Sequence, residues 1–184
     1  MGLIKRVTLL VLVVLLTTCV ASRLSLAPKP DCQSIVYYKI DPRFTLSQTS
    51  LILRSMKAWE DGTGGYLCFA PGNGGIWIVK TDQQPLQRQI EILGAKFNNI
   101  KPEEVVGLAN YPGAFILTGK LDNDQDFYRT IIHEIGHLLG IDHYLGPEPS
   151  WMYPSISLTP GNGARNLTEY DSFEFCKKHG CYVP

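Results

Sequence analysis

The sequence has no excess of charge of either sign, since 17 Lys and Arg residues balance 17 Asp and Glu residues. It also has no cluster of basic side chains that could follow a phosphate backbone, so we expect no nucleic-acid partner. Internal repeats and low-complexity tracts are absent. A chain of 184 residues is long enough for one compact domain and too short for two ordinary ones. We therefore expect one folded domain and a monomer.

The apolar run near the N-terminus is shorter than the roughly 20 residues that a membrane-spanning helix needs. It extends from Val7 to Leu16 and follows two basic residues, Lys5 and Arg6. A positive start followed by a short apolar run is typical of an export leader. We assign residues 1–21 to this leader and residues 22–33, which are rich in Pro and polar residues, to a linker or short pro-segment.

Two processing routes fit the end of this leader. Residues 16–19 resemble the lipobox of a bacterial lipoprotein, in which Cys19 would be acylated and would anchor the protein to a membrane. Alternatively, an ordinary signal peptidase cuts after Ala21 or the residue that follows it, where small residues are suitably placed. Both routes predict an exported protein, either secreted or lipid-anchored on the extracytoplasmic side of a membrane.

Cysteine is scarce, with five residues in the chain. Both processing routes remove Cys19 from the fold, which leaves an even set of four. Cys176 and Cys181 flank a short segment that closes easily in an oxidising compartment, and a bond between Cys32 and Cys68 follows by subtraction. Four free thiols are the alternative, because sequence alone does not determine connectivity.

Hydrophobic periodicity and turn residues divide the rest of the chain into strands and helices. Strands are predicted at residues 34–40, 66–69, 75–80, 105–109 and 114–118. Helices are predicted at residues 47–59, 85–93 and 126–139, and a last one opens with a capping-box pattern at Thr168 and stops at Gly180. The mixture of both element types predicts an α+β domain over residues 34–184.

Three of the chain's four histidines lie between His133 and His143. His133 and His137 are four residues apart, so on a helix they lie roughly 40° apart on one face and one turn above each other. His143 would face away from them if the helix continued. Gly140 can adopt the left-handed conformation cheaply, so it predicts that the helix ends and the chain turns back to complete the site.

Three histidines without a fourth protein ligand are typical of a catalytic zinc, because structural zinc sites are usually closed by four ligands. Glu134 directly follows the first histidine and could take a proton from a water whose pKa zinc has lowered to about 7. The alternative is that the three histidines and Glu134 are ordinary surface residues of a helix. That alternative requires every element of a long motif to coincide by chance.

The spacing His-Glu-x-x-His-x-x-Gly-x-x-His resembles the zinc signature of the metzincin metallopeptidases. Metzincins also have a methionine turn beneath the metal, and Met152 fits that role. Met152-Tyr153-Pro154 resembles the matrixin (matrix metalloproteinase) family within the metzincins. The segment that begins with Leu108 and Ala109 and ends at Gly113 also resembles a matrixin segment, whose strand forms the rim of the substrate cleft in that family.

This resemblance implies a metzincin-like domain, with a twisted mixed sheet and helices above a zinc cleft, and a small, loop-rich C-terminal part that ends in a helix. It also implies that Leu108, Ala109 and Pro154 contact the substrate. Matrixins hold a second, structural zinc with further histidines, but here only His179 remains outside the motif and Asn110 replaces a rim histidine. We therefore predict one zinc ion per chain.

An acidic run precedes the zinc helix and consists of Asp122, Asn123, Asp124 and Asp126. Calcium prefers such oxygen ligands, but Phe127 stands where a calcium-binding EF-hand loop would need Gly. We expect instead that these residues begin a helix, where negative charge suits the positive end of the dipole.

Together these features predict a zinc-dependent metalloendopeptidase that hydrolyses protein or peptide substrates outside the cytoplasm. The catalytic base would be Glu134 and the metal ligands His133, His137 and His143. The alternative is a surface lipoprotein that keeps zinc, has lost catalysis and only binds peptides. Retention of Glu134 argues against that alternative.

Overall fold

The computed structural model describes residues 32–81, 105–121, 123–155, 160 and 166–182. The predicted leader, most of the linker and the predicted helix at 85–93 lie outside these residues. Two helices and five strands of the described part match the sequence-based predictions to within about three residues at each end, and the last helix begins where its capping residue predicts. No helix in the described part is both long and apolar enough to cross a membrane.

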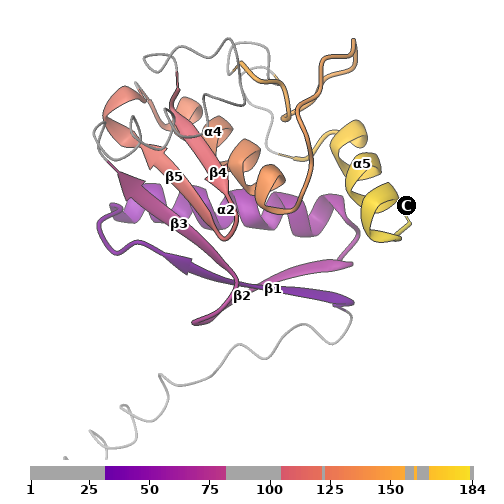
Figure 1. Ribbon diagram of the computed structural model, residues 1–184, viewed down its shortest axis with the longest axis horizontal. Helices are drawn as coiled ribbons and strands as arrows, with labels where there is room; N and C mark the ends of the chain where they lie inside the picture. Colours follow the sequence, from indigo (N-terminus) through magenta and orange to yellow (C-terminus); the bar gives the residue numbers. More distant parts are fainter. Residues whose placement is uncertain (1–31, 82–104, 122, 156–159, 161–165, 183–184) are drawn as a thin grey trace, which may run out of the picture.

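Five strands form one mixed sheet, ordered β2-β1-β3-β5-β4 (Figure 1). The strands are β1 (Ser34–Ile40), β2 (Leu67–Pro71), β3 (Ile76–Thr81), β4 (Gly107–Asn110) and β5 (Gly113–Leu117). Only the β4–β5 hairpin is antiparallel, and all other neighbouring pairs are parallel. Because β4 is the last strand in this order, it lies at an edge of the sheet, and the backbone groups on its outer side face away from β5.

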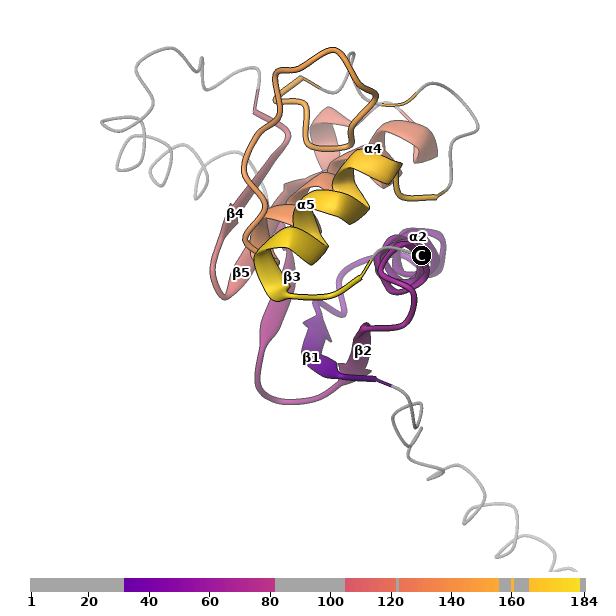
Figure 2. The same cartoon turned by 90° about the vertical axis from the view of Figure 1, so that its right-hand side faces the viewer.

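Three α-helices lie on the same side of this sheet, as Figure 2 shows. They are α2 (Leu46–Gly62), α4 (Asp124–Leu138) and α5 (Glu169–His179), and a short 3-10 turn, η3 (Thr118–Lys120), precedes α4. Thr45 caps α2 with a complete capping box that includes Gln48, so this helix starts earlier than the predicted Ser47. α4 also begins two residues earlier than predicted, because Asn123 caps it.

The core fills the space between the helices and the sheet. Ile52, Met56 and Trp59, which the sequence places on one face of α2, are at most 2% exposed. The Trp59 indole N–H donates to the Ile132 carbonyl oxygen at 3.0 Å. This bond joins α2 to α4 at the residue before the first predicted metal ligand. It therefore helps to hold α4 in position against α2.

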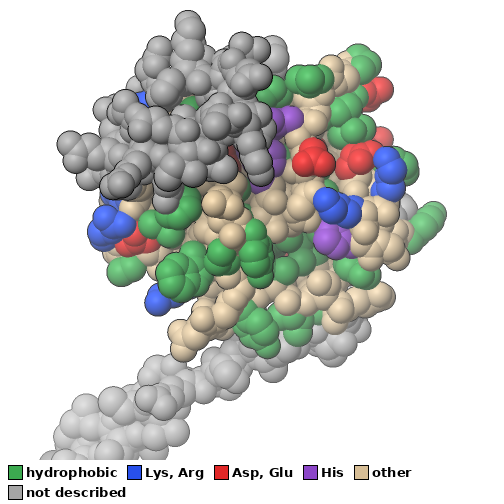
Figure 3. Space-filling view, viewed as in Figure 1, with side chains coloured by type: hydrophobic (Ala, Val, Ile, Leu, Met, Phe, Trp, Pro, Cys, Tyr) green, Lys and Arg blue, Asp and Glu red, His purple; other side chains and the backbone are tan. Residues whose placement is uncertain are grey.

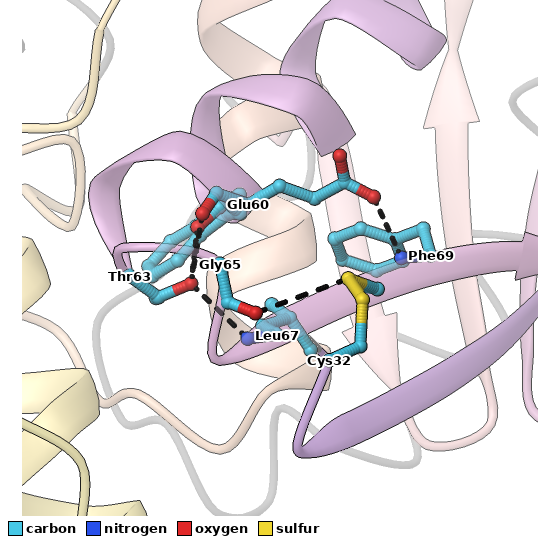
Figure 4. The surroundings of a disulfide bond; sticks show 8 residues. Cys32, Glu60, Thr63, Gly65, Leu67 and Phe69 are labelled. Carbon is cyan, nitrogen blue, oxygen red and sulfur yellow. Dashed lines mark hydrogen bonds between the residues drawn. A yellow bond between two sulfur atoms is a disulfide. The ribbon is translucent and has the colours of Figure 1, made fainter. Parts of the chain in front are cut away.

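Two disulfides are present, Cys32–Cys68 and Cys176–Cys181, which confirms the predicted pairing. Figure 4 shows the surroundings of the first, where the end of α2 meets β2. The Glu60 carboxylate there accepts a hydrogen bond from the Phe69 N–H at 2.9 Å. The start of β1 is thus linked covalently to β2, and β2 is hydrogen-bonded to α2.

The opposite face of the sheet carries exposed aromatic side chains, among them Tyr37 and Trp77, which are 49% and 47% exposed. Hydrophobic side chains gather on this face in Figure 3. A groove of about 600 Å³ runs between the end of β1, β3 and the β4–β5 turn. None of the histidines lines it, so it is separate from the predicted metal site.

Candidate active site

α4 carries the first two predicted ligands, and its start is determined by the acidic run. The Asn123 side chain accepts hydrogen bonds from the N–H groups of Gln125 and Asp126, at 2.9 and 3.0 Å. Asp124 and Asp126 lie in the first turn of the helix, where their charges stabilise the dipole. These three residues have the helix-start role that we expected, and Asp122 lies outside the described residues.

The turn after α4 has the geometry that Gly140 predicts. Gly140 has a φ of 84°, and the N–H groups of Gly140 and Ile141 donate to the carbonyls of His137 and Gly136, each at 2.9 Å. This is the Schellman arrangement that ends a helix with a left-handed residue. The chain therefore reverses between the second and the third predicted ligand.

As a result, the three predicted ligands come together, and we call them the histidine cluster (His133, His137 and His143). One ring nitrogen from each lies within 4.8 Å of the others. Ring centroids are 4.6 Å apart for His133 and His137, 4.6 Å for His137 and His143, and 5.2 Å for His133 and His143. It is the only group of three or more such ligands among the residues the structure describes.

Backbone carbonyls orient two of these rings. His133 Nδ1 bonds the Trp151 carbonyl oxygen at 2.7 Å, and His137 Nδ1 bonds the Ile141 carbonyl oxygen at 2.8 Å. A carbonyl only accepts, so both Nδ1 atoms carry the proton and each neutral ring keeps a lone pair on Nε2. Such a bond on the far nitrogen is the usual support of a histidine that binds a metal.

The electrostatic environment keeps the histidine cluster neutral. Burial, followed by the neighbouring His137 and His143, lowers the pKa of His133 to about 3. Burial also lowers the pKa of His137 and of His143. Neutral imidazole is the form that binds zinc, so the lone pairs are available without the loss of a proton.

Glu134 lies between α4 and β4 and is only 5% exposed. The Ala109 N–H donates to its carboxylate, while its Oε2 atom has no hydrogen-bond partner in the described part of the chain. Burial raises the pKa of Glu134 to about 8. A Cβ at Gly107 would lie 2.6 Å from Oε1, so only glycine at that position of β4 leaves room for this carboxylate.

Met152 is fully buried and packs against α4 between the first two histidines. A Cβ placed on Gly136 would lie 2.3 Å from its sulfur atom and 2.9 Å from the Trp59 ring. The lack of a side chain at Gly136 therefore lets Met152 approach the helix beneath the histidine cluster.

Gly136→Ala is accordingly expected to lower the free energy of unfolding by about 1–3 kcal/mol, the usual cost of overpacking a core. Chemical denaturation of purified protein measures this change. Gly119→Ala is the matched control, because a Cβ there meets nothing within 4 Å. Equal stability of the two variants would contradict this packing argument.

Asp171 of α5 supports the segment that contains Met152. Its fully buried carboxylate accepts hydrogen bonds from Ser150 Oγ at 2.6 Å and from the Trp151 N–H at 3.0 Å. The Trp151 carbonyl in turn holds His133. A chain of hydrogen bonds thus connects the start of α5 to the first predicted ligand.

Only one of the two hydrogen bonds of the capping box predicted at Thr168 is present. Thr168 Oγ1 accepts from the Asp171 N–H at 3.1 Å, as predicted. The Asp171 carboxylate does not return a bond to the Thr168 backbone, because it binds the Met152 segment and the Thr168 hydroxyl instead. The sequence pattern marked the helix start but gave no sign of this second role.

The predicted substrate contacts occupy different surroundings. Ala109 packs on the main core near Glu134, whereas the Leu108 side chain packs in a small separate cluster with Leu117 and Phe115. Pro154 is exposed and follows Met152 by two residues.

The donor set fits zinc, because three neutral imidazoles bring one nitrogen each to within 4.8 Å of the others, and α4, which carries two of them, also carries the buried Glu134 carboxylate oxygen that has no hydrogen-bond partner in the described part of the chain. A family model described as matrixin matches residues 25–175, which is most of the chain. The chain belongs to the matrixin family. It is a metzincin-like zinc metalloendopeptidase, and zinc is its cofactor.

The solved structures that resemble this matrixin are distant from it in sequence. High choriolytic enzyme 1, a hatching enzyme zinc-protease from Oryzias latipes (medaka fish), is 11% identical with a TM-score of 0.48, over 80% of this chain and 90% of that chain. Myroilysin is 16% identical with a TM-score of 0.48, over 86% of this chain and 98% of that chain. No curated protein sequence matches the chain significantly. The family assignment therefore rests on the family model.

Proposed function

We propose that this matrixin hydrolyses peptide bonds of extracytoplasmic proteins, with the histidine cluster as its zinc ligands and Glu134 as its general base. The observation that carries the proposal is the position of Glu134, whose buried Oε2 atom has no partner in the described part of the chain and whose neighbour His133 belongs to the histidine cluster. Zinc bound there would activate a water and polarise the scissile carbonyl. The positive charge of that zinc would favour the ionised form of Glu134, which would then take the proton of the attacking water and pass it to the leaving amine.

The substrate would lie extended along β4. This strand is at the sheet edge, and its Gly107 and Ala109 contact the Glu134 side chain. A peptide that adds a strand to this edge would place its backbone beside the general base. Backbone pairing of this kind depends little on side chains, so we expect several sequences to be cleaved.

Export is the second part of the proposal. Two disulfides favour an oxidising compartment, and the N-terminal residues have the pattern of a leader. Acylation of Cys19 would place the domain on a membrane surface, and ordinary cleavage would release it. A peptide-binding surface lipoprotein without catalysis remains the alternative function, and the assay below separates the two.

The test is the digestion of a broad peptide library, read by mass spectrometry. Wild-type protein is expected to cleave internal peptide bonds, to stop when a chelator removes the metal, and to recover when zinc is added back. Fractionation of expressing cells locates the activity, and Cys19→Ser should release any membrane-bound share. No cleavage by fully zinc-loaded protein would establish the peptide-binding alternative instead.

A further inference from the structure

The end of α5 lies beside the turn that connects the second and third zinc ligands, although the two segments are about 40 residues apart in sequence (Figures 1 and 2). His179 Nε2 donates to the Leu139 carbonyl oxygen at 2.9 Å. Lys178 Nζ donates to the Gly140 carbonyl oxygen. Both contacts come from the segment between Cys176 and Cys181.

Three successive carbonyls of this turn are therefore held by side chains. Leu139 and Gly140 are bound by α5, and the next carbonyl, of Ile141, is bound by the ring of His137. These three carbonyls lie at the C-cap of α4 and in the turn directly after it, where a positive charge such as that of Lys178 suits the negative end of the helix dipole. His143 follows two residues later, so its position depends on how this turn is held.

The two α5 side chains are themselves fixed. The His179 ring stacks on the buried Phe175 ring, with centroids 4.4 Å apart and an interplanar angle of 26°. The His179 carbonyl accepts from the Tyr66 hydroxyl at 2.9 Å. The Cys176–Cys181 disulfide closes the chain around them, and Gly180 ends the helix with a φ of 75°.

We propose that Lys178 and His179 form a C-terminal clamp that positions the turn before His143 and thereby raises the affinity of the site for zinc. They are positioning residues, because neither contacts the histidine cluster or the substrate strand. The clamp gives a role to the fourth histidine of the chain, which lies outside the zinc signature. The proposal rests on the zinc site of the proposed function, but zinc affinity is measured without substrate, so the two can fail separately.

The test is zinc affinity of the folded domain, measured by competition with a chromophoric chelator at 25 °C. The double variant Lys178→Met, His179→Phe removes both donors while it retains the length of the lysine stem and the ring stacked on Phe175. We expect about tenfold weaker zinc binding, which lies within the usual range for the loss of hydrogen bonds that support metal ligands. Each single variant should lose about fivefold or less.

Two controls separate positioning from general stability. Lys177→Ala changes the neighbouring lysine, which pairs with Glu174 rather than with α4, and should bind zinc as the wild type does. Lys178→Arg, His179→Gln keeps an N–H donor at both positions and should stay within about twofold of the wild type. If the donor-deleting variant melts earlier but binds zinc as tightly as the wild type, or if the donor-keeping variant loses as much affinity, the clamp is refuted. Wild-type protein that binds no zinc at all would refute the proposed function instead.

Discussion

Glu134→Ala is expected to lower kcat/KM by about 10²- to 10⁴-fold, the usual cost of losing a positioned general base. Zinc should stay bound, because the histidine cluster does not include this carboxylate. Residual hydrolysis would come from the remaining metal site. Initial rates on any peptide from the library digest, together with metal analysis of the same sample, measure both quantities.

Glu134→Gln provides the sharper version of this experiment. Its amide oxygen can still accept from the Ala109 N–H, so the contact with β4 is kept while the base is lost. Glu174→Gln serves as the control, because it changes a half-buried glutamate of α5 that forms an ion pair with Lys177 and lies outside the histidine cluster. Hydrolysis by either Glu134 variant at the wild-type rate would remove this residue from the mechanism.

His137→Ala should abolish tight zinc binding, and with it both hydrolysis and the stability that zinc adds. Zinc at 1,000 times its dissociation constant stabilises a folded protein by about 4 kcal/mol. Wild-type protein should therefore melt at a clearly higher temperature with zinc than with chelator, and His137→Ala should melt at nearly the same temperature in both.

His179→Gln is the matched histidine substitution outside the cluster and should keep the zinc-dependent shift in melting temperature. A His137→Ala variant that still gains the full shift would show that zinc binds elsewhere. Glu134→Ala and His137→Ala should thus fail in different ways, because the first loses rate with its metal present and the second loses the metal itself.

The histidine cluster could be predicted because its three members are close together in sequence. Helical spacing places His133 and His137 on one face, and the left-handed Gly140 turns the chain so that His143 returns. Both are consequences of local backbone geometry, which a run of eleven residues between His133 and His143 contains in full. The presence of strand β4 and the two disulfide pairs could also be predicted, from turn residues and from the number and spacing of the cysteines, whereas the edge position of β4 was implied only by the matrixin resemblance.

The support of that site was decided only by the tertiary structure. Asp171 holds the Met152 segment from 20 residues away, and His179 holds the Leu139 carbonyl from 40 residues away. Gly107 leaves room for Glu134 although the two lie on different elements. Residue type and spacing cannot reveal such pairs, because the packing of distant segments decides which buried polar groups meet. Each buried polar group then forms a hydrogen bond with the partner that packing brings to it. The sequence alone therefore determined the chemistry of the site, and the fold determined how that chemistry is held in place.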